Sequence, residues 1–406
     1  MSSARGGKNA MILSGGGAYG AYEVGVMRAL FEGRCASTQF EVFDPDIVTG
    51  TSAGAFNAAL LLSAGQADSV SAVQYVEDVY LNEVADSMTS CGNGVLRFRG
   101  LPIEFFDDGC YRPNPLRPLI DLAQDAAFIA GDLMRRASHF VRSRNVDFEQ
   151  RTLELINLES YTSADKFVEL VYRRIIPANI RSSGKTVQVL ATNWITGDLR
   201  VFQTEDFTDE VGRLAVLASS AIPGVFPSVE IENQPYVDGG LVMNTALRPP
   251  VEAGADVLHV INVDPVTRAL PLSRLRSTAT TVYRMMVITL SAMLDRDIEI
   301  AGRINAGIDI LQMGAQGMIP ADPSASALQL IIGSLPLHMQ TGLPYRKLTV
   351  HRYHPKGDPG GALRWLSFGR DHLAQLMEAG YQEAIAHDCD ENACVLADPS
   401  EKVTYG

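Results

Sequence analysis

A serine between two glycines is the first place in this chain where the residue types could do chemistry. Gly50-Thr-Ser-Ala-Gly54 matches the pattern G-x-S-x-G, with Ser52 at its centre. In this pattern the serine lies on a sharp turn between a strand and a helix, and its neighbours are small because the backbone passes close to itself. The pattern also occurs by chance in loops, so it indicates a nucleophile only where a strand precedes it and a helix follows it. Ser52 is predicted to be a nucleophile, with Gly50 and Gly54 shaping its turn.

An acid beside two glycines is the second candidate. Asp238 precedes Gly239 and Gly240 and follows an extended segment that begins at Ser228. A serine hydroxyl does not ionise near neutral pH, so a nucleophile such as Ser52 needs a base. The glycines allow two loops to approach closely, and Asp238 is predicted to take the proton directly. The alternative is a tight turn in which the aspartate only favours the bend.

A glycine-rich loop offers backbone amides to a developing oxyanion. Gly15, Gly16 and Gly17 lead into a predicted helix, where free N–H groups and the helix dipole stabilise negative charge. A second interpretation stays open here. Gly15, Gly17 and Gly20 also fit G-x-G-x-x-G after a strand, with an acidic residue about 20 positions later, which is the dinucleotide-binding fingerprint. A P-loop is excluded, because no Gly-Lys-Ser/Thr follows.

Hydrophobic periodicity predicts the elements that must position these residues. The apolar runs 10–13 and 46–50 are each followed by a turn and by helical spacing. Two such units predict a parallel sheet flanked by helices. Further strands are predicted at 186–192, 199–203 and 256–263, and helices at 119–144, 273–332 and 371–387. The sequence therefore predicts an α/β fold with a mostly parallel central sheet.

One domain is predicted over residues 1–388, followed by an acidic tail over 389–406. The core motifs span 10–265. A stretch rich in Gly, Pro and Asp, followed by a long helix, predicts a helical insertion over 86–181. The C-terminal part, 266–388, is also predicted to be helical.

Composition limits the partners. The 406 residues are 46% hydrophobic and 20% charged, as in an ordinary folded enzyme. The formal net charge of −13 argues against nucleic acid as a partner, because phosphate binding requires clustered Lys and Arg. No signal peptide is visible, and no apolar run approaches the roughly 20 residues that span a membrane. The expected location is the cytoplasm or the membrane periphery, where the basic segment 135–144 could contact an anionic bilayer.

No metal and no cofactor are expected. The five cysteines include no C-x-x-C pair, so neither a disulfide framework nor a zinc site is predicted. Cys389 and Cys394 are expected to be free thiols, with a disulfide in an oxidising compartment as the alternative. No group of His, Cys, Asp and Glu has ligand spacing along the chain. Of the seven histidines, the six that follow Asp238 are expected to be structural and His139 to lie on a solvated helix face, so a Ser-acid-His triad is not predicted.

Four motifs, taken in order, resemble those of the patatin-like phospholipase family. They are the loop 14–20, Gly50–Gly54, Ala218-Ser-Ser-Ala-Ile-Pro-Gly-Val-Phe-Pro227 and Asp238-Gly-Gly240. The resemblance implies a three-layer α/β/α fold, a dyad of Ser52 and Asp238, an oxyanion hole in the glycine-rich loop, and hydrolysis of acyl esters of phospholipids or neutral lipids. One position departs. Family members usually have Arg or Lys where this chain has Tyr19. Because this cation is absent, the family's headgroup preference and the rigidity of its loop are not carried over to this chain.

The sequence thus predicts a serine esterase of the phospholipase A type that acts on a lipid substrate. Two alternatives from other classes stay open. A dinucleotide-binding oxidoreductase would use the Gly15–Gly20 loop but would leave Ser52 and Asp238 without a role. A noncatalytic interaction protein could have the same fold, but loss of the nucleophile or the acid would be expected, and both are present.

Overall fold

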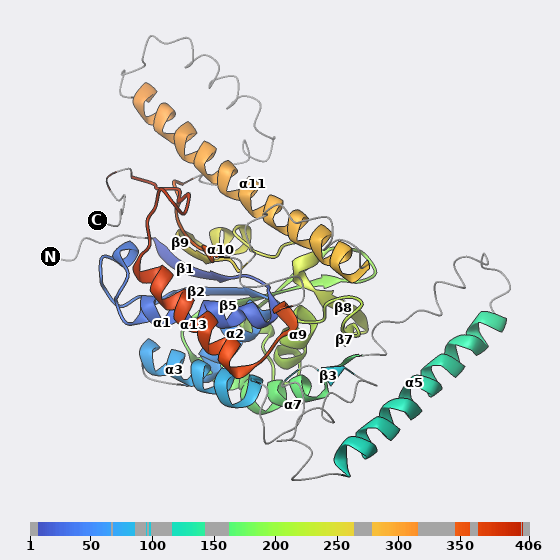
Figure 1. The fold of residues 1–406 in the computed structure, drawn as a ribbon. Coiled ribbons are helices and arrows are strands. Elements are labelled where there is room, and N and C mark those ends of the chain that lie inside the picture. Colours follow the sequence, from blue (N-terminus) through green and yellow to red (C-terminus); the bar gives the residue numbers. More distant parts are fainter. Residues whose placement is uncertain are drawn as a thin grey trace.

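The computed structural model describes residues 7–65, 68–85, 95, 97–98, 116–142, 162–263, 278–315, 346–357, 364–398 and 400. Within these residues, a mixed sheet lies between layers of helices (Figure 1). Its strands are β1 (Lys8–Leu13), β2 (Ile47–Thr51), β5 (Thr186–Asn193), β6 (Leu199–Gln203), β7 (Val229–Ile231), β8 (Gln234–Asp238), β9 (Ala255–Ile261) and β10 (Thr349–Tyr353). Neighbours follow the order β10-β9-β1-β2-β5-β8-β7, and β6 also pairs with β5. A separate short pair joins β3 (Arg97–Phe98) to β4 (Thr162–Ser163).

Most of the sheet is parallel. β10, β9, β1, β2 and β5 run in one direction, whereas β6 and the β7–β8 hairpin pair antiparallel to their neighbours. The two hairpin loop residues, Glu232 and Asn233, have φ values of 54° and 60°. Positive φ at both positions defines a type I′ turn, which matches the twist of the flanking strands. This turn brings the chain back along β8, which ends at Asp238.

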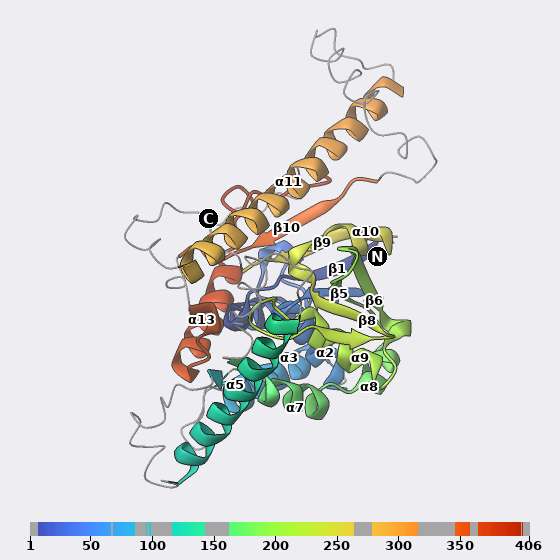
Figure 2. The same cartoon turned by 90° about the vertical axis from the view of Figure 1, so that its right-hand side faces the viewer.

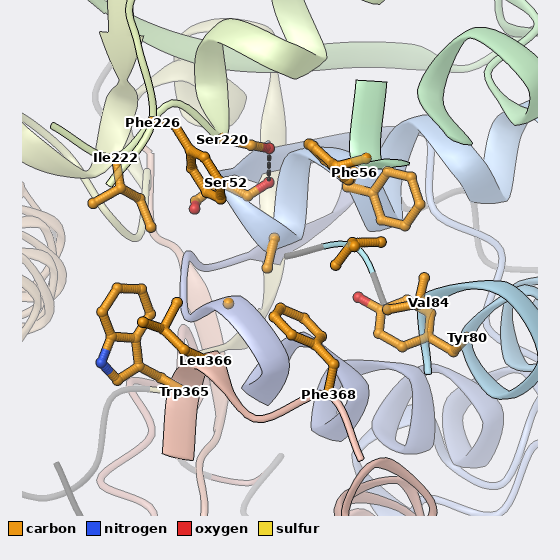
Figure 3. A pocket seen from close by; sticks show the side chains of 14 residues that line it. Ser52, Phe56, Tyr80, Val84, Ser220, Ile222, Phe226, Trp365, Leu366 and Phe368 are labelled. Atoms are coloured by element: carbon orange, nitrogen blue, oxygen red, sulfur yellow. Dashed lines mark hydrogen bonds between the residues drawn. The ribbon is translucent and has the colours of Figure 1, made fainter. Parts of the chain in front are cut away.

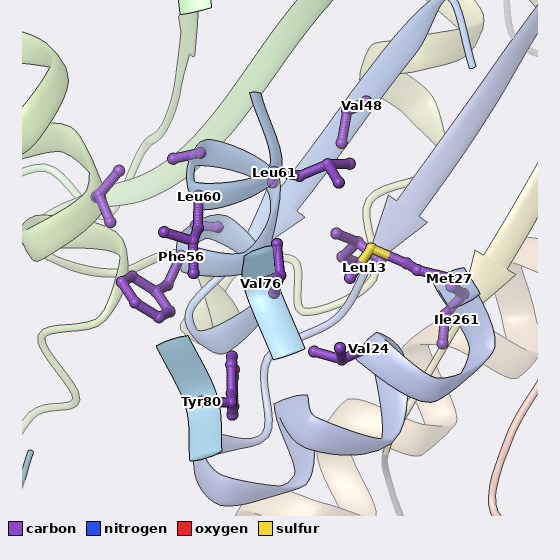
Figure 4. Packing of buried hydrophobic residues seen from close by; sticks show 14 of the residues in the cluster. Leu13, Val24, Met27, Val48, Phe56, Leu60, Leu61, Val76, Tyr80 and Ile261 are labelled. Atoms are coloured by element: carbon purple, nitrogen blue, oxygen red, sulfur yellow. The ribbon is translucent and has the colours of Figure 1, made fainter. Parts of the chain in front are cut away.

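Helices cover both faces of the sheet, so the chain has two apolar cores. On one face lie α1 (Gly20–Phe31), α2 (Ala53–Ser63), α3 (Ser69–Val79), α7 (Asp165–Arg174), α8 (Pro177–Ser182), α9 (Val211–Ser219) and α13 (Arg370–Ile385). On the other lie α10 (Arg248–Glu252) and α11 (Thr278–Ala315). Along β1, Met11 and Leu13 join the first core, while Ala10 and Ile12 join the second. Burial on both faces explains why β1 contains the continuous apolar run 10–13. Figure 4 shows the first core, where Leu13 lies beside side chains of α1 and β9.

Short helical turns connect these elements. They are η1 (Gly17–Tyr19), η2 (Ala36–Thr38), η6 (Thr204–Asp206), η7 (Gly239–Leu241) and η10 (Arg364–Leu366). A π-helical turn, η3 (Tyr80–Val84), continues α3. Two of these turns contain glycines that the sequence analysis singled out: η7 directly follows β8, and η1 begins shortly after β1.

The C-terminal helix packs directly on the first helix (Figures 1 and 2). Two glycines allow this contact. A Cβ atom at Gly25 of α1 would lie 1.8 Å from the carbonyl oxygen of Met377, and one at Gly380 of α13 would lie 2.1 Å from that of Tyr22. Since neither position has space for a side chain, the two backbones approach as closely as they can. Helix α13 is thereby held closely against α1.

One long amphipathic helix, α5 (Arg117–Arg142), extends along one side of the body (Figures 1 and 2). It corresponds to the helix predicted at 119–144. Several of its large apolar side chains are exposed, among them Leu119, Ile120, Met134 and Val141. Among the described residues, no helix combines the length and the apolar character needed to cross a bilayer.

The predicted α/β fold with a mostly parallel sheet is confirmed. The strands expected at 186–192, 199–203 and 256–263 are β5, β6 and β9, the last ending two residues early. The helix expected at 371–387 is α13. Much of the predicted insertion 86–181, and the part of the helical region 273–332 that follows Ala315, lie outside the described residues.

Candidate active site

Ser52 lies in the turn between β2 and α2, at the N-terminus of the helix. Its φ of 54° and ψ of −122° are unusual for a residue with a side chain, so the turn is strained. The flanking glycines follow from the same geometry. A Cβ at Gly50 would lie 2.3 Å from the carbonyl oxygen of Gly54, and one at Gly54 would lie 2.3 Å from that of Leu13. The chain therefore crosses itself at a distance that only glycine permits.

Asp238 meets Ser52 from the end of β8. The Ser52 side chain lies within interaction range of the Asp238 carboxylate, whose Oδ1 accepts a hydrogen bond from the Gly240 N–H at 2.8 Å. Both side chains are buried. At Gly239 a Cβ would lie 2.4 Å from the carbonyl oxygen of Leu190, which accounts for the first glycine of the pair. The structure thus brings together the serine and the acid that the sequence analysis selected.

Burial sets the proton affinity of this carboxyl group. It raises the pKa of Asp238 from 3.8 to about 7, although the interactions with Ser52 and Gly240 pull the pKa in the opposite direction. A carboxylate that titrates near neutral pH is a stronger base than an exposed aspartate. It is therefore suited to accept a proton from a hydroxyl.

The glycine-rich loop lies directly against Ser52, because a Cβ at Gly15 would be 2.8 Å from the serine Cβ. The N–H of Gly15 donates to Asn244 Oδ1 at 3.0 Å, and Asn244 Nδ2 donates back to the Gly15 carbonyl at 3.2 Å. The first predicted oxyanion donor, the Gly15 N–H, is therefore already hydrogen-bonded to Asn244. Within the described residues, the amides of Gly16 and Gly17 donate to no protein acceptor. Sequence reasoning missed Asn244, since no local pattern connects it to this loop.

The segment 218–227 holds the serine turn from the opposite side. The Ser52 N–H donates to Ser219 Oγ at 2.9 Å, and Ser220 Oγ donates a longer bond of 3.4 Å to the Ser52 carbonyl (Figure 3). Ala221 accepts a hydrogen bond from the Asp238 amide at 2.9 Å. In the sequence, this segment is only one of the four motifs that carry the family resemblance. Its serines and backbone position the nucleophile and the acid together.

An apolar pocket opens beside Ser52 (Figure 3). Its lining comes from distant parts of the chain and is mostly aliphatic and aromatic: Phe56, Tyr80, Val84, Val95, Phe167, Ile222, Phe226, Trp365, Leu366 and Phe368. Ile222 and Phe226 lie on one side of the space, and the side chains from η10 and the residues after it lie on the other. Such a lining suits a hydrocarbon chain and offers a charged group no partner.

A family model described as Patatin-like phospholipase matches residues 11–251. The chain belongs to the patatin-like phospholipase family. Its α/β fold is the fold that the resemblance implied, and membership supports a lipid ester hydrolase function. The glycine-rich loop on which the dinucleotide interpretation depends lies against Ser52 in this structure.

Two solved structures are similar to this patatin-like chain at 16% sequence identity. VipD from Legionella pneumophila aligns with a TM-score of 0.33 over 92% of this chain and 67% of its own. The type III effector protein ExoU aligns with a TM-score of 0.30 over 94% of this chain and 52% of its own. This chain therefore spans about half the length of ExoU. No curated protein sequence matches it.

Tyr19, where patatin-like proteins usually have a cation, is a buried packing residue. Its N–H donates to the Gly16 carbonyl at 3.1 Å, which closes η1. Its ring meets His372 of α13 edge-on, with centroids 6.5 Å apart. Packing against the C-terminal helix therefore supports the loop on the side where the family has a charged residue.

A group of potential metal ligands that are not closely spaced along the sequence forms in the fold of this patatin-like chain. His351, His387, Cys389 and Cys394 place their ligating atoms within 4.8 Å of one another. Their separation along the sequence hid the cluster, because β10 and the residues after α13 meet only in the folded chain. Residues 389–398, expected to form a tail, pack beside β10. None of the four ligands lines the Ser52 pocket, and neither does any other histidine of the described residues.

Proposed function

We propose that this protein hydrolyses carboxylic ester bonds of phospholipids or related acyl lipids through a Ser52 acyl-enzyme, with Asp238 as general base. The observation that carries the proposal is the position of Ser52 beside the buried carboxyl group of Asp238, at the wall of an apolar pocket. A nucleophile, its base and a site for a hydrocarbon chain are thus adjacent.

The reaction begins when Asp238 takes the proton of Ser52 and Oγ attacks the ester carbonyl carbon. The amides of Gly16 and Gly17, together with the N-terminal end of α2, stabilise the oxyanion, while Asn244 keeps the Gly15 amide engaged. Collapse of the tetrahedral intermediate breaks the ester bond, and the leaving alcohol takes the proton from Asp238. Water then gives a proton to Asp238 and attacks the acyl-enzyme. The fatty acid leaves, and the proton returns to Ser52.

The pocket supports a long acyl chain as the recognised part of the substrate. Each methylene buried there contributes about 0.8 kcal/mol, so several methylenes can supply most of the binding free energy. Trp365, Leu366 and Phe368 belong to this lining although they lie beyond residue 251, where the family match ends. We therefore infer that residues 1–388 work as one domain, with the C-terminal part completing the pocket.

Covalent labelling of Ser52 tests the proposed mechanism. A fluorophosphonate probe should form a single adduct with the native chain, and peptide mass analysis should locate it on Ser52. Ser220, which lines the same pocket, should stay unlabelled because its hydroxyl points to the carbonyls of Ser52 and Val216. Absence of any adduct, with no turnover of acyl esters in the presence of lipid vesicles, would instead support a noncatalytic role on this fold.

We infer that α5 contacts the lipid surface. Leu119, Ile120, Met134 and Val141 are exposed and lie on one side of the helix by its 3.6-residue period. Exposed Arg135 lies near its C-terminal end. Apolar side chains on one side and arginines at the end are typical of a helix that lies in the membrane interface.

Charge placed on the apolar side of α5 should weaken this contact. The double variant Leu119→Asp/Met134→Asp is expected to bind anionic vesicles at least about tenfold more weakly, since it removes two apolar side chains worth roughly 1.5 kcal/mol or more each. Co-sedimentation measures binding, and hydrolysis of a soluble short-chain ester should be unchanged. The matched control, Gln124→Asp, adds charge on the polar side. Equal binding by the double variant and the control would contradict the assignment of α5.

A further inference from the structure

A second group of reactive side chains forms at the edge of the sheet, away from the Ser52 pocket. His351 lies in β10, and the other three members follow the end of α13. The segment 387–394 forms an ordered turn in which the Cys394 N–H donates to the Cys389 carbonyl at 2.9 Å. Reciprocal backbone hydrogen bonds of 2.6 and 3.0 Å between Val350 and Val395 then fix this turn beside β10. The topology, and not one short motif, assembles the group.

The distances within the group fit a single metal ion. Cys389 Sγ lies 3.8 Å from His351 Nδ1 and 3.7 Å from His387 Nε2, and Cys394 Sγ lies 3.4 Å from His387 Nε2. In a tetrahedral site with Zn–S near 2.3 Å and Zn–N near 2.05 Å, a sulfur and a nitrogen are separated by about 3.6 Å. These three distances therefore lie near the spacing that a tetrahedral ion would require, and all four ligand atoms lie within 4.8 Å of one another.

The surroundings also suit a metal site. His351, His387 and Cys389 are buried. The Nε2 atom of His387 faces both sulfurs, 3.7 Å from Cys389 Sγ and 3.4 Å from Cys394 Sγ. The Arg352 backbone N–H donates to Cys394 Sγ at 3.4 Å, a contact that would also stabilise this sulfur as a metal-bound thiolate. Contacts of this kind orient ligands and are typical of the outer shell of metal sites.

The chemical types of the four ligand atoms determine which metal ion suits the site. Two sulfurs and two imidazole nitrogens, with no carboxylate among them, suit zinc and do not suit Mg²⁺ or Ca²⁺, which require oxygen ligands. Two thiolates would also neutralise the charge of a divalent ion, which makes the site acceptable in a buried position. Both cysteines are thiols in this structure and are not joined as a disulfide.

We propose that His351, His387, Cys389 and Cys394 bind one Zn²⁺ ion in a structural site. On binding, the two thiols lose their protons to solvent, both imidazoles bind in the neutral form, and four Zn–ligand bonds form. All four positions are filled by protein, so the ion has no open position for catalysis. It ties the residues after α13 to β10, and α13 in turn packs on α1. The ion would thereby stabilise the C-terminal part that supplies Trp365 to the substrate pocket.

Metal content of the full-length protein tests this site independently of lipid hydrolysis. Protein purified under reducing conditions, stripped with a chelator and reloaded with Zn²⁺ should hold about one zinc per chain by elemental analysis. Loading with Co²⁺ should produce the visible absorption of a tetrahedral ion and a near-ultraviolet thiolate charge-transfer band. Zn²⁺ should raise the melting temperature of the stripped protein, whereas Mg²⁺ should not.

Variants locate the ion. Cys389→Ser/Cys394→Ser should reduce bound zinc to background and abolish the charge-transfer band, whereas Cys35→Ala, which changes a buried thiol outside the cluster, should retain both. His351→Ala gives a second test that leaves the thiols intact and should also lose the ion. The proposal is overturned if reduced, folded wild type binds no zinc and gives no cobalt charge-transfer band. It is equally overturned if the double serine variant keeps a full equivalent of zinc.

Discussion

Replacing Ser52 with alanine should lower the rate of ester hydrolysis at least about 10³-fold, because no acyl-enzyme can then form. The variant should fold normally, since alanine tolerates the turn no worse than serine does and the Ser219 contact uses the main-chain N–H of residue 52. Release of a chromogenic acid from short-chain and long-chain esters, with and without vesicles, measures the effect. Circular dichroism and the melting temperature check the fold.

Asp238→Asn should cause a loss of comparable size. The amide oxygen can still accept from the Gly240 N–H, so the loop is kept, but an amide cannot take the proton of Ser52. Ser220→Ala is the matched control, because its hydroxyl contacts carbonyl groups and not the carboxylate. It should retain activity within about tenfold of the wild type. Equal rates in all four proteins would refute the dyad and point to a binding role.

Activity should rise with pH and reach half of its maximum near the pKa of Asp238, which is about 7. Only the carboxylate can act as base, so protonation below this pH removes the active form. The dependence of kcat/KM on pH, measured with an uncharged ester, reports this group in the free enzyme. A profile that stays flat from about pH 5 to about pH 9 would show that no carboxyl group of this kind limits the reaction.

The same shift predicts how stability depends on pH. The pKa of Asp238 is about 7 in the folded chain and near 3.8 when unfolded, so between these values the folded state keeps a proton that the unfolded state has lost. This group therefore favours folding at low pH, and raising the pH through the window removes up to about 4 kcal/mol of that stability. Above pH 7 the buried, charged carboxylate lowers the free energy of unfolding.

Asp238→Asn has no such titration. Its melting temperature relative to wild type should therefore increase from about pH 5 to about pH 8, while its activity stays low. The comparison at two pH values cancels any constant effect of the substitution on packing. A difference in melting temperature that does not change with pH would show that the carboxyl group is not buried as the structure has it.

Local patterns were sufficient for the core of this fold. The strands β1, β2, β5 and β9 are largely buried on both faces and contain short apolar segments, such as residues 10–13, which a single sequence shows directly. The turn around Ser52 and the pair after Asp238 were also visible, because backbone crowding there excludes any side chain. These features depend on residues that are neighbours in the chain.

Hydrophobic periodicity does not predict contacts between segments that are far apart in the chain. The contact of α1 with α13 depends on Gly25 and Gly380, which look like ordinary helix interruptions until the two backbones are seen together. Residues after 388 contain enough charge to suggest a solvated tail, yet they pair with an edge strand. The partner lies about 355 residues away in the first case and 45 in the second, and only the folded chain brings it near.

The sequence by itself determined the α/β class, the turn that holds Ser52 and the acid before two glycines, because each follows from the packing and backbone requirements of a short segment. The tertiary structure alone decided that Asn244 holds the loop amide 229 residues earlier in the chain, and that Trp365 completes the pocket. It also decided that His351 meets Cys389 and Cys394. These contacts depend on which strands become neighbours, and that order results from burying both faces of the sheet at once, which no local pattern specifies.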